Sequence, residues 1–346
     1  MTSIFEKEIY QQPEVIARLI KNRAAGIREL AEILRKNPPR FVLIAARGTS
    51  DNAAIYAKYL FTGINRIPAG LAMPSLHTLY QISPDLSGGL VIGISQSGQT
   101  PDVRAVLETA LKQGVPTISI TNAEQSPTAT ASEYAINLGA EEEKSVAASK
   151  TYTSQLTAVA MLSAYFSGDE ERIAAINSIP GYIDKVLQQR SAAEAIAARF
   201  SKKNHVAIVG RGFNYCTTHE IALKIKEMAY MVAQPYSAAD FRHGPIAMLE
   251  PGFPVLAIAV RGDALVDMET MIESIRQTDA DLAMITNVMN LNRDTEDVIQ
   301  VPEGIPDWLS PVTCTVPGQL LALHLALEKG FNPDKPRGLS KVTLTY

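Results

Sequence analysis

The sequence is poor in the residues that mark disulfide-rich, metal-binding and membrane proteins. It holds two cysteines, Cys216 and Cys314, without metal-ligand spacing or the pattern of a disulfide framework. No apolar run approaches the length that spans a bilayer, and MTSIFEKEIYQQ at the N-terminus lacks the basic-then-apolar pattern of a signal peptide. We therefore expect a cytoplasmic protein with no membrane partner, no metal site and no cofactor.

The sequence also lacks a large excess of charge of either sign. The net charge is −4, from 32 basic and 36 acidic residues, and no basic patch indicates a nucleic-acid partner. Neither GxxxxGK[ST] nor GxGxxG occurs, which argues against a nucleotide polyphosphate as ligand. With 46% apolar and 20% charged residues the chain is expected to be globular, and 346 residues favour two domains.

The chain repeats itself. FVLIAARGTSDNAAIYAKYLF, from Phe41, and HVAIVGRGFNYCTTHEIALKI, from His205, both read as a short apolar strand, a glycine turn and a helix. Further matches keep the same order and nearly the same offset, among them Gly98 with Gly262. Each half reads as four short strands alternating with helices. This pattern predicts an α/β fold whose parallel sheets carry helices on both faces.

The repeat and the segments around it predict the organisation of the chain. We expect an N-terminal helical segment at 1–38, a first domain at 39–168, a helical connector at 169–201, a second domain at 202–330 and a C-terminal tail at 331–346.

Two strands of the first half end in polar residues, in Gly48-Thr49-Ser50 and in SQSGQT at 95–100. Ligands of open parallel sheets bind beyond the carboxyl ends of the strands. Helix N-terminal N–H groups and hydroxyls there can hold a phosphate without any lysine or arginine. The second half has Ala-Val-Arg at 259–261 in place of Ser-Gln-Ser at 95–97. An ordinary helix cap remains the alternative for any single Ser or Thr.

Charged residues of the second half supply candidates for catalysis. In HEIALKIKEMAY, Glu220, Lys224 and Glu227 share one predicted helix face, and spacing alone favours a solvated row of ion pairs. His243, just before Gly-Pro in DFRHGPIAML, has the context of a general acid or base, with a merely exposed loop histidine as the alternative. Lys341, in the tail, precedes a short apolar strand and is by itself typical of a solvated lysine.

Six segments occur in order along the chain: ARGTS, SQSGQT, SVAASKTYTSQL, ALKIKEMAY, FRHGPIAML and DKPRGLSKV. Together they resemble the sugar isomerase (SIS) family. More narrowly, they resemble the isomerase half of glucosamine-6-phosphate synthase (glutamine–fructose-6-phosphate aminotransferase) and standalone glucosamine-6-phosphate deaminases. The resemblance implies two tandem flavodoxin-like SIS domains, at 39–168 and 202–330, and a homodimer with its active site near the subunit interface.

The resemblance also implies roles for individual residues. Glu227 would move a proton between C1 and C2, and His243 would assist ring opening, from the neighbouring subunit. Lys341 would sit at the sugar carbonyl, where the synthase forms a Schiff base. The phosphosugar would contact Thr49, Ser50, Ser95, Gln96, Ser97, Thr100 and Val146. Supporting positions would be Gly48, Glu220, Lys224 and Ser340.

The expected reaction follows from the same resemblance. The segments match the isomerase half, and a glutaminase half is not among them, so we expect glucosamine 6-phosphate and water to give fructose 6-phosphate and ammonia. Gln99 and Ser340 depart from the synthase pattern, which has Glu and Ala there. Alternatives left open are another phosphosugar isomerase, a galactosamine-6-phosphate deaminase, a fructosamine-phosphate deglycase, the isomerase subunit of a split transaminase and a non-catalytic sugar-phosphate sensor.

Overall fold

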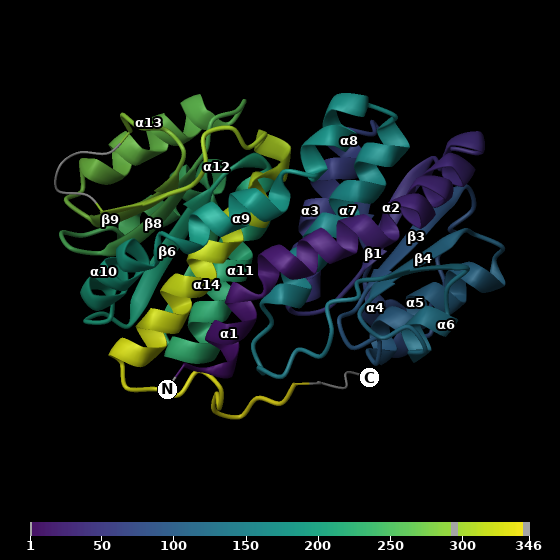
Figure 1. Cartoon of the computed structure of the whole chain (residues 1–346), viewed down its shortest axis with the longest axis horizontal. Helices are drawn as coiled ribbons and strands as arrows, with labels where there is room; N and C mark the ends of the chain where they lie inside the picture. Colours follow the sequence, from purple (N-terminus) through teal and green to yellow (C-terminus); the bar gives the residue numbers. More distant parts are fainter. Residues whose placement is uncertain (1, 292–296, 342–346) are drawn as a thin grey trace. The chain divides into compact units, whose positions relative to one another are not determined.

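The structure is a computed structural model that describes residues 2–291 and 297–341 (Figure 1). The described residues form two compact units, each with a parallel five-stranded sheet. The β1–β5 unit contains residues 14–143, 150–178 and 340–341. The β6–β10 unit contains residues 2–13, 144–149 and the described part of 179–339.

The β1–β5 unit has its strands in the order β2-β1-β3-β4-β5. The strands are β1 (Phe41–Ala45), β2 (Ala69–Leu71), β3 (Gly89–Ile94), β4 (Thr117–Thr121) and β5 (Tyr134–Asn137). The helices are α3 (Thr49–Gly63), α4 (Pro74–Thr78), α5 (Pro101–Lys112), α6 (Pro127–Thr130), α7 (Lys150–Ser167) and α8 (Glu170–Ile176), together with most of α2 (Gln12–Lys36). Every residue of β3 and β4 is buried, as expected for central strands covered on both faces.

The β6–β10 unit has its strands in the order β10-β9-β8-β6-β7. The strands are β6 (His205–Gly210), β7 (Val232–Ser237), β8 (Pro254–Ala259), β9 (Asp281–Thr286) and β10 (Asp297–Gln300). The α-helices are α1 (Ile4–Tyr10), α9 (Ile179–Leu187), α10 (Arg190–Phe200), α11 (Tyr215–Ala229), α12 (Ala238–Arg242), α13 (Leu265–Arg276) and α14 (Ser310–Glu328), and 3-10 turns are η1 (Gly212–Asn214), η2 (Pro245–Met248) and η3 (Asp307–Leu309).

Helices cover both faces of the first sheet, because residues of both parities along its central strands are buried. Ala45 of β1 and Val91 of β3 pack with Val103 and Leu107 of α5 on one face. The alternating residues, such as Ile92, are buried as well. Helices α3 and α7 pack against each other and also contact the sheet. The same design recurs in the second unit, where α12 and α13 share a core with β6, β8 and β9, and α11 packs on β6 and α14.

An ion pair at matching positions supports the internal repeat. Arg47, just after β1, lies 2.6 Å from Asp102 on α5, and Arg211, just after β6, lies 3.2 Å from Asp267 on α13. The predicted α/β fold with two tandem parallel sheets is confirmed. The expectation of four strands in each half is wrong by one strand, because β2 has three residues and the edge strand β7 contains Pro235, so neither reads as an apolar run.

No helix of the described residues has the length and apolarity needed to cross a membrane.

The second unit contains a carboxylate that gives a pH prediction. Burial, and then the negative charge of Asp263, raise the pKa of Asp307 from 3.8 to about 6. A raised carboxyl pKa means that the folded state holds the proton more tightly. The contribution of Asp307 to the free energy of unfolding therefore falls as the pH rises from about 4 to about 6 and stays constant above that range.

Asp307→Asn is therefore expected to raise the free energy of unfolding at pH 7.5 by about 1–2 kcal/mol, after discounting for solvent screening of a partly exposed group, and by less at pH 4. Urea unfolding at the two pH values measures this difference. Asp184→Asn, at an exposed position of α9, is the control and should change neither value. An equal gain for Asp307→Asn at both pH values would contradict the prediction.

Candidate active site

The polar strand ends of the β1–β5 unit lie side by side. Strands β1 and β3 are parallel neighbours, with Ala45 opposite Gly93, so their carboxyl ends meet at one edge of the sheet. The chain leaves β1 toward β2 and leaves β3 toward β4, in opposite directions along the sheet. The point between two such strands is where open α/β sheets bind their ligands. The structure thus brings Thr49 and Ser50 to the same edge as residues 95–100.

The loop after β3 is fixed by its own hydroxyl groups. Ser95 is buried, and its Oγ accepts a hydrogen bond from the Gly98 N–H at 3.1 Å and lies 3.0 Å from Thr100 Oγ1. Ser97 Oγ accepts from the Gln99 N–H at 3.2 Å. Gly98 has φ +64°, and a Cβ there would lie 2.0 Å from Ser126 Oγ. The loop therefore requires glycine at this position and small hydroxyl residues around it.

Both helices that start at this edge lack a side-chain cap at the N-cap position. Gly48 precedes α3 with φ +57°, and Thr100 precedes α5, whose first residue is a proline. Ser50, in the first turn of α3, is buried and accepts a hydrogen bond from Gln155 Nε2 at 2.9 Å. The nearby cation Arg47 is paired with Asp102, so the edge has no unpaired positive charge from that residue.

The charged row of α11 is buried, in the β6–β10 unit. The exposed side-chain fractions are 0% for Glu220, 1% for Lys224 and 22% for Glu227. Lys224 Nζ lies 2.5 Å from Glu227 Oε2 and 3.5 Å from Glu220 Oε1. The expectation of a solvated row of ion pairs, which spacing alone favours, is thus wrong, because tertiary packing covers this part of the helix. The arrangement holds two carboxylates on one buried ammonium, with the outer carboxylate partly open to solvent.

His243 lies at the C-terminal end of α12, in the same unit. Its backbone N–H donates to Asp240 O at 3.1 Å, and the residue is exposed. Within the described part of the chain, its ring makes no hydrogen bond that would tie it to the α11 row. The histidine is therefore accessible, as a group that meets a substrate or a second subunit must be.

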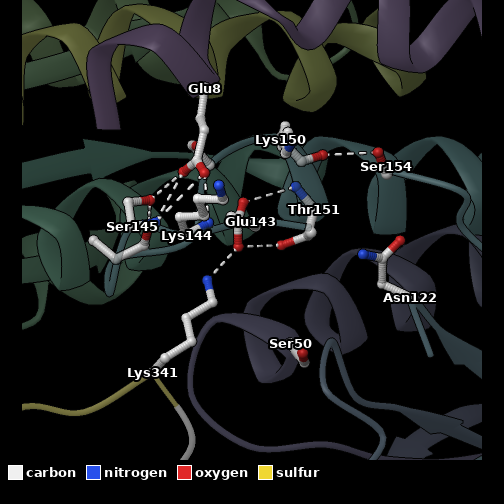
Figure 2. Close-up of polar contacts among 12 residues, drawn as sticks. Glu8, Ser50, Asn122, Glu143, Lys144, Ser145, Lys150, Thr151, Ser154 and Lys341 are labelled. Carbon is white, nitrogen blue, oxygen red and sulfur yellow. Dashed lines mark hydrogen bonds and ion pairs between the residues drawn. The ribbon is translucent and has the colours of Figure 1, made fainter. Parts of the chain in front are cut away.

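Lys341 makes a short ion pair within the β1–β5 unit. Its Nζ lies 2.6 Å from Glu143 Oε2, and the exposed side-chain fractions are 25% for Lys341 and 0% for Glu143 (Figure 2). Thr151, near the start of α7, donates its N–H to Glu143 Oε1 at 3.0 Å and its hydroxyl to Oε2 at 2.7 Å. The strand expected after Lys341 falls at 342–346, outside the described residues.

The remaining predicted positions are Gln96, Val146 and Ser340. Gln96, in the loop after β3, accepts the Asn122 N–H through its carbonyl oxygen at 3.1 Å. Val146 is half-buried in the loop at 144–149, and Ser340, next to Lys341, is exposed.

The segment before Lys341 is fastened to the end of α11. Tyr230 has φ +53° just after the helix, and its hydroxyl accepts the Arg337 N–H at 2.8 Å. The Arg337 guanidinium lies 3.8 Å from the centre of the Tyr230 ring, and Phe331 packs on the same ring. This contact fixes the tail four residues before Lys341.

The sequence reasoning missed Glu143, Thr151 and Glu8. Glu8 of α1 is 4% exposed, and its carboxylate accepts hydrogen bonds from the Lys144 N–H and from the Ser145 N–H and hydroxyl (Figure 2). Three consecutive glutamates at 141–143 are typical of a solvated charged run, so the buried third one leaves no signal in the sequence.

Comparison with known proteins identifies the relatives of this chain. A family model described as SIS domain matches residues 37–165 and 199–329. A glutamine–fructose-6-phosphate aminotransferase [isomerizing] of Pyrococcus horikoshii is 34% identical over 341 residues, which are 97% of this chain and 56% of that protein. The corresponding Escherichia coli protein is 32% identical, at 97% and 58% coverage. The chain thus spans just over half the length of these curated relatives.

Solved structures agree with this relationship. The C-terminal domain of glucosamine-fructose-6-phosphate aminotransferase from Francisella tularensis matches with a TM-score of 0.88 and 27% identity, over 97% of this chain and 99% of that one. A glucosamine-6-phosphate deaminase from Thermotoga maritima shares the fold, with a TM-score of 0.78 at 23% identity over 99% and 100% of the two chains. Both halves of the chain carry the domain, and the chain therefore belongs to the SIS domain family.

Proposed function

We propose that this chain is an enzyme that moves a proton between C1 and C2 of a phosphorylated amino sugar and releases ammonia from it. The reaction is glucosamine 6-phosphate plus water to fructose 6-phosphate plus ammonia. It is supported by the relationship to aminotransferases whose names join an isomerising step to fructose 6-phosphate. Because a site that adds ammonia to a ketose phosphate also removes it, low ammonia favours the direction of release.

The row on α11 carries the proposal. Proton transfer between adjacent carbons needs a carboxylate that a substrate can reach and that is held in one orientation. Glu227 is 22% exposed and lies 2.5 Å from the buried Lys224 ammonium, which meets both needs. In this proposal Glu227 is the base, and Glu220 and Lys224 hold it in place.

Other residues take the remaining steps. Hydroxyl and N–H groups at two helix N-termini would bind the phosphate as neutral donors. They belong to Thr49, Ser50, Ser95, Gln96, Ser97 and Thr100. Lys341 would form an imine with the open-chain sugar, which acidifies the neighbouring C–H. His243 would carry a proton to or from the ring oxygen as the sugar opens.

A product assay tests the proposal. Purified chain is given glucosamine 6-phosphate, and ammonia and fructose 6-phosphate are measured in parallel. We expect both products in equal amounts. Absence of both products, under conditions in which the sugar phosphate protects the protein from thermal unfolding, would contradict the deaminase assignment.

A second candidate has its own supporting observation. The chain spans 56% of the Pyrococcus horikoshii relative, which leaves room in the relatives for a further portion that handles glutamine. The chain would then be the isomerase part of a glutamine-dependent transaminase. Synthesis of glucosamine 6-phosphate from fructose 6-phosphate that requires an added glutaminase, with no measurable release of ammonia, would favour this candidate.

We also propose a homodimer in which His243 serves the neighbouring subunit. If so, mixing inactive His243→Ala and Glu227→Gln subunits recovers about a quarter of the wild-type activity, because mixed dimers contain one site with both native residues. The mixture is unfolded and refolded together, and its activity is compared with that of each variant alone. No recovery, in mixed dimers shown to form by mass spectrometry of tagged subunits, would place His243 in its own subunit's site.

A further inference from the structure

Glu143 has a fully buried carboxylate that nevertheless forms an ion pair with a partly exposed lysine, Lys341. It lies in the loop that follows β5, with a side chain that is 0% exposed. Oε1 accepts the Thr151 N–H, and Oε2 accepts both the Thr151 hydroxyl and Lys341 Nζ (Figure 2). Burying a carboxylate is costly unless hydrogen bonds and an opposite charge compensate for the lost water.

Part of this arrangement is explained by helix capping. Thr151 is the second residue of α7, so Glu143 satisfies one of the N–H groups that every helix leaves unpaired at its start. The helix dipole also favours a negative charge there. Capping uses both Thr151 donors and leaves the contact with Lys341 unexplained. A cap alone needs no lysine on Oε2 at 2.6 Å.

We propose that Glu143 is the proton acceptor for Lys341 when this lysine forms its imine with the sugar. The inference rests on the function proposed above for Lys341 and deepens it. The atom that must lose a proton, Nζ, lies within hydrogen-bond distance of a carboxylate oxygen. The Thr151 N–H binds Oε1 and its hydroxyl binds Oε2, so Thr151 holds the acceptor in its orientation toward the lysine.

The proton balance closes without any other group. The Lys341 ammonium gives one proton to Glu143, and the neutral amine adds to the sugar carbonyl carbon to form a carbinolamine. The nitrogen proton of the adduct moves to its oxygen. Glu143 then returns its proton to the hydroxyl, the C–O bond breaks, and water leaves with formation of the protonated imine. Glu143 ends as the carboxylate that it was at the start.

Reductive trapping tests the inference. Borohydride is added to the protein with fructose 6-phosphate, and mass spectrometry follows the adduct on the peptide that contains Lys341. Glu143→Gln keeps the shape and an acceptor oxygen but cannot take up the proton. We expect the trapping rate and kcat to fall by at least about 10²-fold, while thermal protection by the sugar phosphate is retained. Glu142→Gln, the exposed neighbour, is the matched control and should trap at the wild-type rate.

The outcomes separate this inference from the proposed function. Wild-type protein that gives no adduct on Lys341 contradicts the imine itself, and the inference falls with it. Wild-type protein that traps normally, with Glu143→Gln trapping equally fast, overturns the inference and leaves the function intact. Should Glu143→Gln fail to fold, Glu143→Asp carries the test. Its shorter acid should slow trapping by about tenfold, and an unchanged rate would overturn the inference.

Discussion

Glu227→Gln is expected to lower kcat for glucosamine 6-phosphate by about 10²–10⁴-fold, the usual contribution of a positioned general base. The amide has the shape of the carboxylate, and its oxygen can still accept a hydrogen bond from Lys224, so the fold should be retained. Substrate binding should also be retained, because the phosphate-binding residues proposed above are unchanged. Steady-state kinetics and thermal protection by the sugar phosphate measure the two properties separately.

The control for this variant is Glu269→Gln. Glu269 is an exposed carboxylate on α13 in the same unit, and its loss should leave kcat unchanged. Full activity in Glu227→Gln would remove this carboxylate from the mechanism. A loss of thermal protection together with activity would instead indicate that Glu227 is needed for binding.

Lys224→Met is expected to lower the free energy of unfolding by about 3–5 kcal/mol, the cost of removing one partner from a buried ion pair. Methionine fills much of the volume but removes the ammonium that lies 3.5 Å from the fully buried Glu220 and 2.5 Å from Glu227. Urea unfolding gives the difference, and activity should fall as well.

Two further variants show whether the lower stability of Lys224→Met comes from the buried ion pair. Lys226→Met changes an exposed lysine on the same helix and should stay within about 0.5 kcal/mol of the wild type. Glu220→Gln added to Lys224→Met should restore part of the stability, because the buried negative charge that faced the lost ammonium is then gone. A Lys224→Met protein as stable as the Lys226→Met control would show that the buried pair contributes little to the fold.

The alternation of apolar strands with helices predicts the architecture well, because it depends on local periodicity and on a sheet covered on both faces. The strand-end rule likewise predicts, from the order of strands and polar loops alone, that Thr49 and the loop at 95–100 share one edge. Periodicity does not predict strands without an apolar run. In β2 and β7, pairing with the neighbouring strand determines the strand instead.

Burial of charged residues could not be predicted from the sequence. The spacing of Glu220, Lys224 and Glu227 shows that they share a face, but long-range packing of α11 with α14 and β6 determines that this part of the helix is covered. The burial of Glu143 could not be predicted either, because it depends on tertiary contacts. One of its partners, Lys341, is far away in the sequence, and the other, Thr151, lies beyond the loop at 144–149. Site residues that depend on tertiary burial leave the weakest local signal.

Proton transfer by Glu227 between C1 and C2 of the sugar phosphate is tested most directly by running the reaction on glucosamine 6-phosphate in D₂O and locating deuterium in the product by NMR. The protonated carboxylate exchanges with solvent during turnover, so we predict deuterium at C1 of fructose 6-phosphate, formed together with ammonia. Fructose 6-phosphate without deuterium at C1, or no product at all, would contradict the account.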